Sequence, residues 1–158
     1  MKAVYRGLAL AVAALVMLQA AFIAYAVFGL SKWVREDGGT LDASVFAEGS
    51  TVQVGGEIGF ALHGISGTFL VPLVALILLI VSFFAKVPGG VKWALIVFGV
   101  VVVQYALAFL GRVASLPAVG ALHGLNALIL FGVAVTAAMR LRTEEDRPAR
   151  NTADTSVA

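Results

Sequence analysis

The chain has 158 residues, a length that suits one domain. Its composition is not that of a soluble protein, because 61% of residues are hydrophobic, 13% are charged and the mean hydropathy is +1.00. The net charge of +2 comes without a clustered basic patch, which argues against nucleic-acid binding. The absence of cysteine excludes disulfides and thiolate metal sites.

Four stretches of the chain carry no charged residue, at 7–31, 58–85, 93–111 and 113–139. Crossing the hydrocarbon core takes about 20 apolar residues, and a backbone in lipid must satisfy its own hydrogen bonds. We therefore predict an all-α membrane protein, with helices over about 5–31, 57–85, 91–113 and 117–141. These helices form a four-transmembrane-helix up-down bundle that occupies residues 1–142.

The basic residues predict the orientation of this bundle. Eight Lys and Arg residues lie in the N-terminus, the 86–92 turn and the C-terminal segment, against three on the other side. By the positive-inside rule both termini face the cytoplasm, and the 32–56 loop lies outside. We expect a multi-pass protein of the bacterial cytoplasmic membrane, with a disordered cytoplasmic tail at 143–158.

A short repeat contains the only two histidines of the chain. The tetrapeptide Ala-Leu-His-Gly occurs at 61–64 and again at 121–124, each time near the start of an apolar segment. The preceding helix contains Gln19 in the first case and Gln104 in the second. The pattern indicates a tandem hairpin repeat, a common arrangement in membrane proteins. We assign the two glutamines mainly to helix packing.

His63 and His123 are the central candidates for a functional site. An ionisable side chain inside a membrane segment is costly and usually functional. In an up-down bundle the second and fourth helices lie diagonally across the core, so the two imidazoles share one depth and point inward. We predict that they are the axial, metal-binding ligands of a haem b. Small or polar neighbours would keep the haem faces clear: Gly64, Ser66, Gly67, Gly124 and Asn126.

Arg112 is a lone cation at the predicted outer end of the third helix. Haem propionates need charged partners, and arginine pairs well with carboxylates. We therefore assign Arg112 to the cofactor site, with Lys32 and Arg35 as weaker candidates; the alternative is an arginine that snorkels to water. A bare zinc or copper site is less favoured, because the sequence offers no third ligand at this depth.

The second hairpin resembles part of the haem A synthase family. Gln104-Tyr105-Ala106-Leu107-Ala108-Phe109-Leu110-Gly111, a short loop and Ala121-Leu122-His123-Gly124-Leu125-Asn126-Ala127 look like the Gln-bearing, His-bearing hairpin of that family. The resemblance implies that His63 and His123 bind haem. It does not imply the synthase reaction, because this chain has one four-helix unit, two histidines and no carboxylate inside an apolar segment. The whole chain is also similar to small uncharacterised four-helix membrane proteins of high-GC Gram-positive bacteria.

Three functions remain open at the level of sequence. The first is a b-type haem protein for electron transfer or haem handling near the outer face, which needs a redox partner in or at the membrane. The second is a cofactor-free accessory subunit of a larger respiratory membrane complex, whose histidines bond neighbouring helices. The third is a quinone-binding or small-molecule-binding module. Nothing points to an enzyme, no catalytic residue is assigned, and homo-oligomerisation stays open.

Overall fold

A computed structural model describes residues 1–45, 53–114 and 116–140. Over these residues the chain is helical without strands, and four helical segments are long and apolar enough to cross a membrane. The predicted all-α, four-transmembrane-helix architecture is thus confirmed. The predicted tail at 143–158 and part of the predicted 32–56 loop lie outside the described residues.

The first helix, α1, spans Lys2–Arg35 and is longer at both ends than the predicted 5–31. Lys32 and Arg35 lie in its last turn, where positive charge stabilises the negative end of the helix dipole. The ammonium of Lys32 also contacts the carboxylates of Glu36 at 3.7 Å and Asp37 at 3.0 Å. The basic residues that we assigned to the loop therefore prolong the helix, and the loop begins at Glu36.

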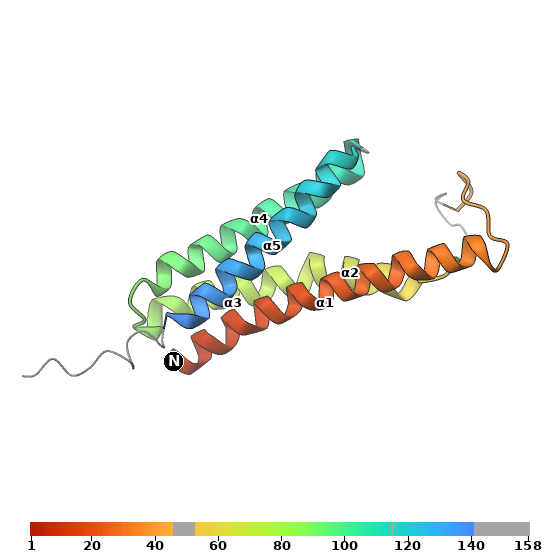
Figure 1. Cartoon of the computed structure of the whole chain (residues 1–158). Helices are drawn as coiled ribbons and strands as arrows, with labels where there is room; N and C mark the ends of the chain where they lie inside the picture. Colours follow the sequence, from red (N-terminus) through yellow and green to blue (C-terminus); the bar gives the residue numbers. More distant parts are fainter. Residues whose placement is uncertain (46–52, 115, 141–158) are drawn as a thin grey trace, which may run out of the picture.

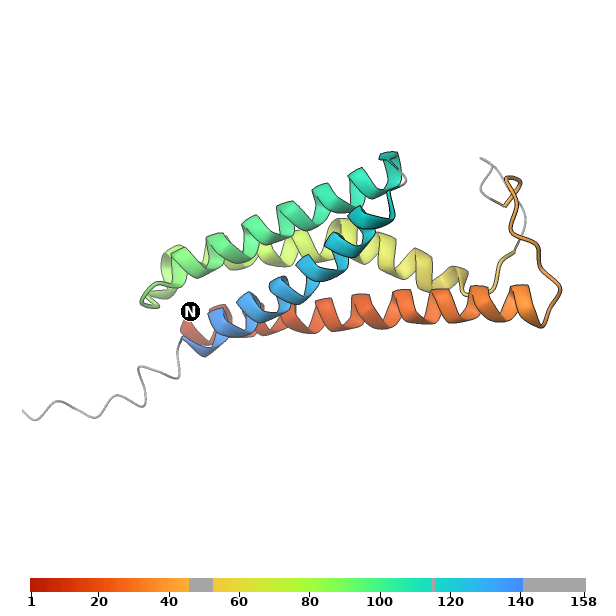
Figure 2. The same ribbon diagram turned by 45° about the horizontal axis from the view of Figure 1, so that its top comes forward.

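The second membrane segment is one helical path in three parts: α2 (Glu57–Ile65), a π-helical segment η1 (Ser66–Leu70) and α3 (Val71–Ala85). Pro72 has no N–H to donate to a carbonyl in the preceding turn, and the wider π turn lies immediately before it. The segment bends between α2 and α3 (Figure 2). Thr68, four residues before Pro72, lies within η1.

The last two helices are α4 (Gly90–Ala114) and α5 (Pro117–Met139). Lys86 and Gly89 adopt left-handed backbone angles, with φ of 51° and 69°, which reverse the chain tightly between α3 and α4. Pro117 opens α5 at a position where a missing N–H costs nothing. Both helices agree within two residues with the predicted 91–113 and 117–141.

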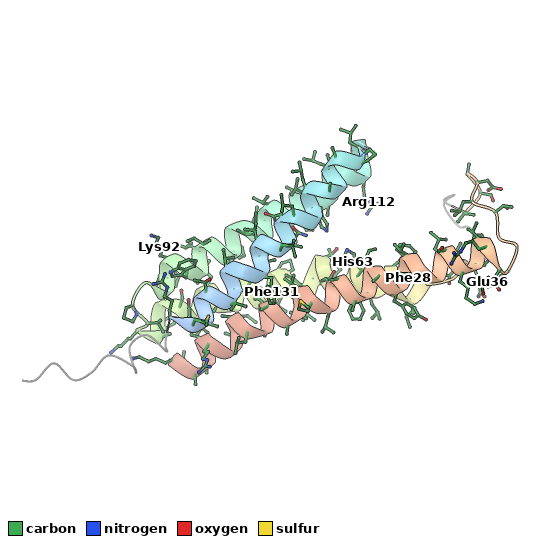
Figure 3. The ribbon with its side chains drawn as sticks, viewed as in Figure 1. Phe28, Glu36, His63, Lys92, Arg112 and Phe131 are labelled. Carbon is green, nitrogen blue, oxygen red and sulfur yellow. The ribbon has the colours of Figure 1, made fainter. Side chains whose placement is uncertain are left out.

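The helices pack in the order of an up-down bundle. α1 packs against α3 and α5, and α4 packs against the same two helices. The second membrane segment and α5 are therefore diagonal partners, as are α1 and α4. Met1, the α3–α4 turn and the end of α5 lie at one end, called the terminus end here (Figure 1). The other end, which carries Glu36 and Arg112, is called the loop end (Figure 3).

All four membrane segments share a core only in the half of the bundle near the terminus end. Small residues dominate it, and Ala9, Ala75, Ala94 and Ala134 are fully buried. Small side chains let helix backbones approach closely, which is how helices associate in lipid. The largest fully buried side chains of this core are Tyr5, Leu78, Leu130, Val12 and Val97.

Toward the loop end the bundle divides into two hairpins. α1 stays beside α2 and α4 stays beside α5, while the two pairs diverge (Figures 1 and 2). The first pair is close because glycines face the opposite backbone: a Cβ on Gly59 would lie 2.6 Å from the carbonyl oxygen of Phe22. The last shared-core residues before the divergence are Val16, Val71, Val101 and Leu130.

Candidate functional site

The two histidines lie where the shared core ends and the hairpins begin to separate. His63 comes from α2 and His123 from α5, the diagonal helices. Their ring centres are 6.3 Å apart, and the ring planes are tilted by 64°. Both residues are half-buried. The structure therefore brings the repeated histidines together, although they are 60 residues apart in the chain.

In the first hairpin, Gln19 of α1 organises the surroundings of His63. The Nδ1 atom of His63 lies 3.1 Å from the backbone oxygen of Gln19. The Gln19 amide nitrogen donates to the backbone oxygen of His63 at 3.0 Å and lies 2.9 Å from the same Nδ1. The amide oxygen accepts from the Gly67 N–H at 3.2 Å and lies 2.5 Å from the Ser66 hydroxyl, which also contacts the backbone oxygen of Leu62. The Nδ1 side of the ring therefore faces Gln19.

In the second hairpin, Gln104 of α4 has the corresponding place beside His123. The Nδ1 atom of His123 lies 3.3 Å from the backbone oxygen of Gln104. The Gln104 amide nitrogen is 3.1 Å from the other ring nitrogen, Nε2. Asn126 fixes this amide, because its Nδ2 donates to Gln104 Oε1 at 2.6 Å and to the backbone oxygen of Val100 at 3.1 Å.

The same local contacts thus occur twice. In each hairpin the histidine faces a glutamine backbone carbonyl, and the polar residue three positions after the histidine bonds the glutamine side chain. Residues three apart on a helix lie on one face, so both polar groups reach the same neighbour. The sequence predicts mainly a packing role for the two glutamines, and in the structure they also contact the histidine rings. Their recurrence one helix before each histidine was the signal for a partner role.

The predicted small and polar neighbours divide into two groups. Gly64 and Gly124 have open space where a Cβ would be, so they leave room beside the histidines. Gly67 instead faces Gln19, whose Oε1 is 3.1 Å from the position of a Cβ. Ser66 and Asn126 are turned toward the glutamines of their own hairpins. These three residues therefore contact the glutamines that face the histidines.

The predicted cations lie away from the histidines. Arg112 is exposed, and Figure 3 shows it at the loop end of the α4–α5 hairpin. Along α4 it is two turns, or roughly 12 Å, beyond Gln104. Lys32 is engaged with Glu36 and Asp37. Arg35 lies in the same last turn of α1, so neither weaker candidate is brought to the histidines.

Among the residues that the structure describes, the arrangement offers two imidazoles and three side-chain amides, with no carboxylate or thiol beside them. Within the described ranges no group of three or more His, Cys, Asp or Glu residues could hold a metal ion. A bare zinc site, which takes at least three protein ligands, therefore has no basis among these residues. A metal already held in a haem would need only the two imidazoles as ligands from the protein.

Comparisons with protein-family models, with curated proteins and with solved structures find no match to this chain. The resemblance to haem A synthase and to small four-helix membrane proteins thus stays a prediction. Any functional assignment depends on the geometry of the site.

Proposed function

We propose that this membrane protein binds one haem b between His63 and His123 and serves in electron transfer or haem handling. The observation that carries the proposal is the 6.3 Å separation of the two ring centres. Imidazoles that bind one metal ion from opposite sides, at about 2 Å each, have ring centres about 6 Å apart. The histidines come from diagonal helices and lie at the point where the two hairpins diverge.

The hydrogen bonds at Nδ1 fit this role. A metal at Nε2 requires the ring proton on Nδ1, and ligating histidines normally donate that proton to a carbonyl or carboxylate. The backbone oxygens of Gln19 and Gln104 stand in this position for His63 and His123. The open space at Gly64 and Gly124 leaves room beside the rings. A haem with both axial positions filled supplies one-electron chemistry.

Arg112 supplies a cation on the loop-end side of the proposed site. Its guanidinium would pair with a propionate in bidentate fashion. A cation beside a haem propionate favours the reduced, less positive iron, so Arg112→Ala should lower the midpoint potential and leave the absorption spectrum intact. Arg112→Lys, which retains the charge, is the matched control in the same potentiometric titration. An unchanged potential in both variants would show that Arg112 does not belong to the haem site.

The test of haem binding is the visible spectrum of the full chain, purified in detergent after expression with added haem. We expect a Soret band and a reducible α band of low-spin type. His63→Ala and His123→Ala should each abolish the low-spin spectrum. Leu62→Ala and Leu122→Ala, at exposed neighbouring positions, should retain it. A colourless wild type, or histidine variants with an unchanged spectrum, would contradict the proposal.

The second candidate is a cofactor-free accessory subunit of a larger membrane complex. One observation favours it: each histidine already has hydrogen-bond partners within its own hairpin. In that function His63→Gln and His123→Gln would preserve assembly, because glutamine also donates and accepts. Co-purification of a stable membrane partner with a colourless protein would support this candidate over haem binding.

The site lies near the outer face of the bacterial cytoplasmic membrane if the basic residues at the terminus end mark the cytoplasm. A cysteine at Ser44, in the exposed segment after α1, should then react with an impermeant maleimide in whole cells. A cysteine at Pro88, in the α3–α4 turn, should react only after lysis. The reverse labelling pattern would place the site in the cytoplasmic half of the membrane.

A further inference from the structure

The two histidines differ in how their metal-binding nitrogen is engaged. In the described part of the chain no residue hydrogen-bonds Nε2 of His63, whose contacts are all at Nδ1. His123 is bonded at both nitrogens, because the Gln104 amide nitrogen lies 3.1 Å from its Nε2. The repeat is therefore symmetric in residues and asymmetric in the hydrogen bonding of Nε2. Metal binding by His63 needs only its ring proton on Nδ1, where the Gln19 carbonyl accepts it, whereas metal binding by His123 needs a hydrogen bond at Nε2 to be broken.

The engagement of His123 is fixed by its neighbours. Asn126 donates to Gln104 Oε1, so the amide of Gln104 must present its nitrogen, a donor, to His123. The Nε2 atom of His123 can then only accept, which puts the ring proton on Nδ1, opposite the carbonyl of Gln104. One tautomer satisfies both contacts. We call the side chains of Gln104 and Asn126 the Gln104 latch.

The first hairpin has no such latch, for a local reason. Ser66 stands where Asn126 stands in the second hairpin, and it has a hydroxyl in place of a forked amide. Its hydroxyl and the N–H of Gly67 both point to the Gln19 amide oxygen, and the amide nitrogen turns to Nδ1 and the backbone oxygen of His63, away from Nε2. Ser66 and Gly67 belong to η1, so the π turn contributes to the asymmetry.

We propose that the Gln104 latch controls His123, so that a haem binds first to His63 and takes His123 only when the Gln104 amide turns away. This inference rests on the proposed haem site. One lone pair on Nε2 cannot both accept from Gln104 and bind iron, so the two interactions exclude each other. The protein thus has one histidine whose Nε2 is not hydrogen-bonded by a described residue and one whose Nε2 must be released, which suits a site that receives or passes on haem.

The latch is tested first without haem, by ¹⁵N NMR of histidine-labelled full-length protein in lipid nanodiscs. In the wild type His123 should be the Nδ1–H tautomer with a hydrogen-bonded Nε2. Gln104→Leu removes the amide but keeps the backbone carbonyl, so the Nε2 resonance of His123 should shift toward that of a free lone pair. Gln19→Leu, the matched control in the other hairpin, should leave the His123 resonances unchanged.

Asn126→Ala gives a second route to the same result, because it frees Gln104 without altering it. It should shift the His123 Nε2 resonance in the same direction by a smaller amount. If neither Gln104→Leu nor Asn126→Ala moves this resonance, the latch does not exist and the proposal is overturned.

The order of ligation is tested by haem titration, followed by optical spectra and electron paramagnetic resonance. His123→Ala should still bind haem, as a five-coordinate high-spin species, whereas His63→Ala should bind at least about tenfold more weakly. Gln104→Leu should favour the six-coordinate form by about threefold to tenfold, the value of one released hydrogen bond. Equal binding by both histidine variants would overturn the order.

Failure of the two proposals can be told apart. A wild type that binds no haem overturns the proposed function and, with it, the order of ligation. The NMR result on the protein without haem still decides whether Gln104 engages Nε2 of His123. Haem binding with unchanged NMR resonances in Gln104→Leu would keep the proposed function and overturn the latch.

Discussion

The half of the bundle near the terminus end and the half near the loop end are held together by different interactions. Near the terminus end four membrane segments close on a continuous apolar core, with alanines at the tightest contacts. Near the loop end each hairpin is held separately, by glycine contacts in the first and a short connection in the second. Lipid tails are as apolar as leucine, so close packing, rather than burial from water, must stabilise the core.

The polar residues lie at the border between these halves. His63, His123, Gln19 and Gln104 all follow the last shared-core residues in the direction of the loop end. A buried polar group in lipid needs a partner, and each of these side chains finds one inside its own hairpin. The polar groups of the candidate site are therefore satisfied within each hairpin, without contacts between the hairpins.

The largest effect is expected in the shared core. Ala134 is fully buried on α5, so Ala134→Leu should force helices apart and cost about 1–3 kcal/mol of unfolding free energy. Denaturant unfolding in micelles, followed by tryptophan fluorescence, measures this. Ala118→Leu on the same helix, exposed near the loop end, should be nearly neutral. Equal losses would mean that the two halves are packed alike.

The next effect tests the glycine contact of the first hairpin. A Cβ at Gly59 would meet the backbone of Phe22 and Ala26 within 3 Å, so Gly59→Ala should separate α2 from α1 at a cost of about 1–2 kcal/mol. Gly64→Ala, where a Cβ meets nothing within 4 Å, should be stabilising by up to about 1 kcal/mol through helix propensity. Opposite signs in thermal unfolding would confirm that only Gly59 maintains a close approach.

A smaller loss is expected for the border glutamines. Gln19→Ala and Gln104→Ala each remove several interhelical hydrogen bonds inside one hairpin, and such bonds contribute about 0.6–1.7 kcal/mol in membranes. The losses should add in the double variant, since the two networks belong to separate hairpins. Strong non-additivity in denaturant unfolding would show that the hairpins are coupled through the site.

The smallest effect is expected at the terminus end, where the guanidinium of Arg140 lies 4.7 Å from the ring centre of Trp93. Cation–π contacts at exposed positions contribute about 0.5–1 kcal/mol. Arg140→Gln should therefore lower the unfolding free energy by this amount, and Arg140→Lys by less. No change in either variant would mean that packing alone secures this end.

Part of the site was predictable from the residues. The repeated Ala-Leu-His-Gly segments and their places in diagonal helices predicted that His63 and His123 would meet. The positions of Gly67, Ser66 and Asn126 were anticipated, but their partners were not. Sequence spacing gives the face of a helix on which a residue lies, and not which neighbour that face meets.

The sequence by itself determined the number, type and approximate bounds of the membrane segments, because lipid excludes charge and demands helical backbone. It also predicted that the two histidines lie near each other, and their ring centres are 6.3 Å apart. Only the tertiary structure decided where the shared core ends and which ring nitrogen each glutamine reaches. Those features depend on the close approach of small residues and on the rotation of each helix, which arise from packing between segments distant in the chain.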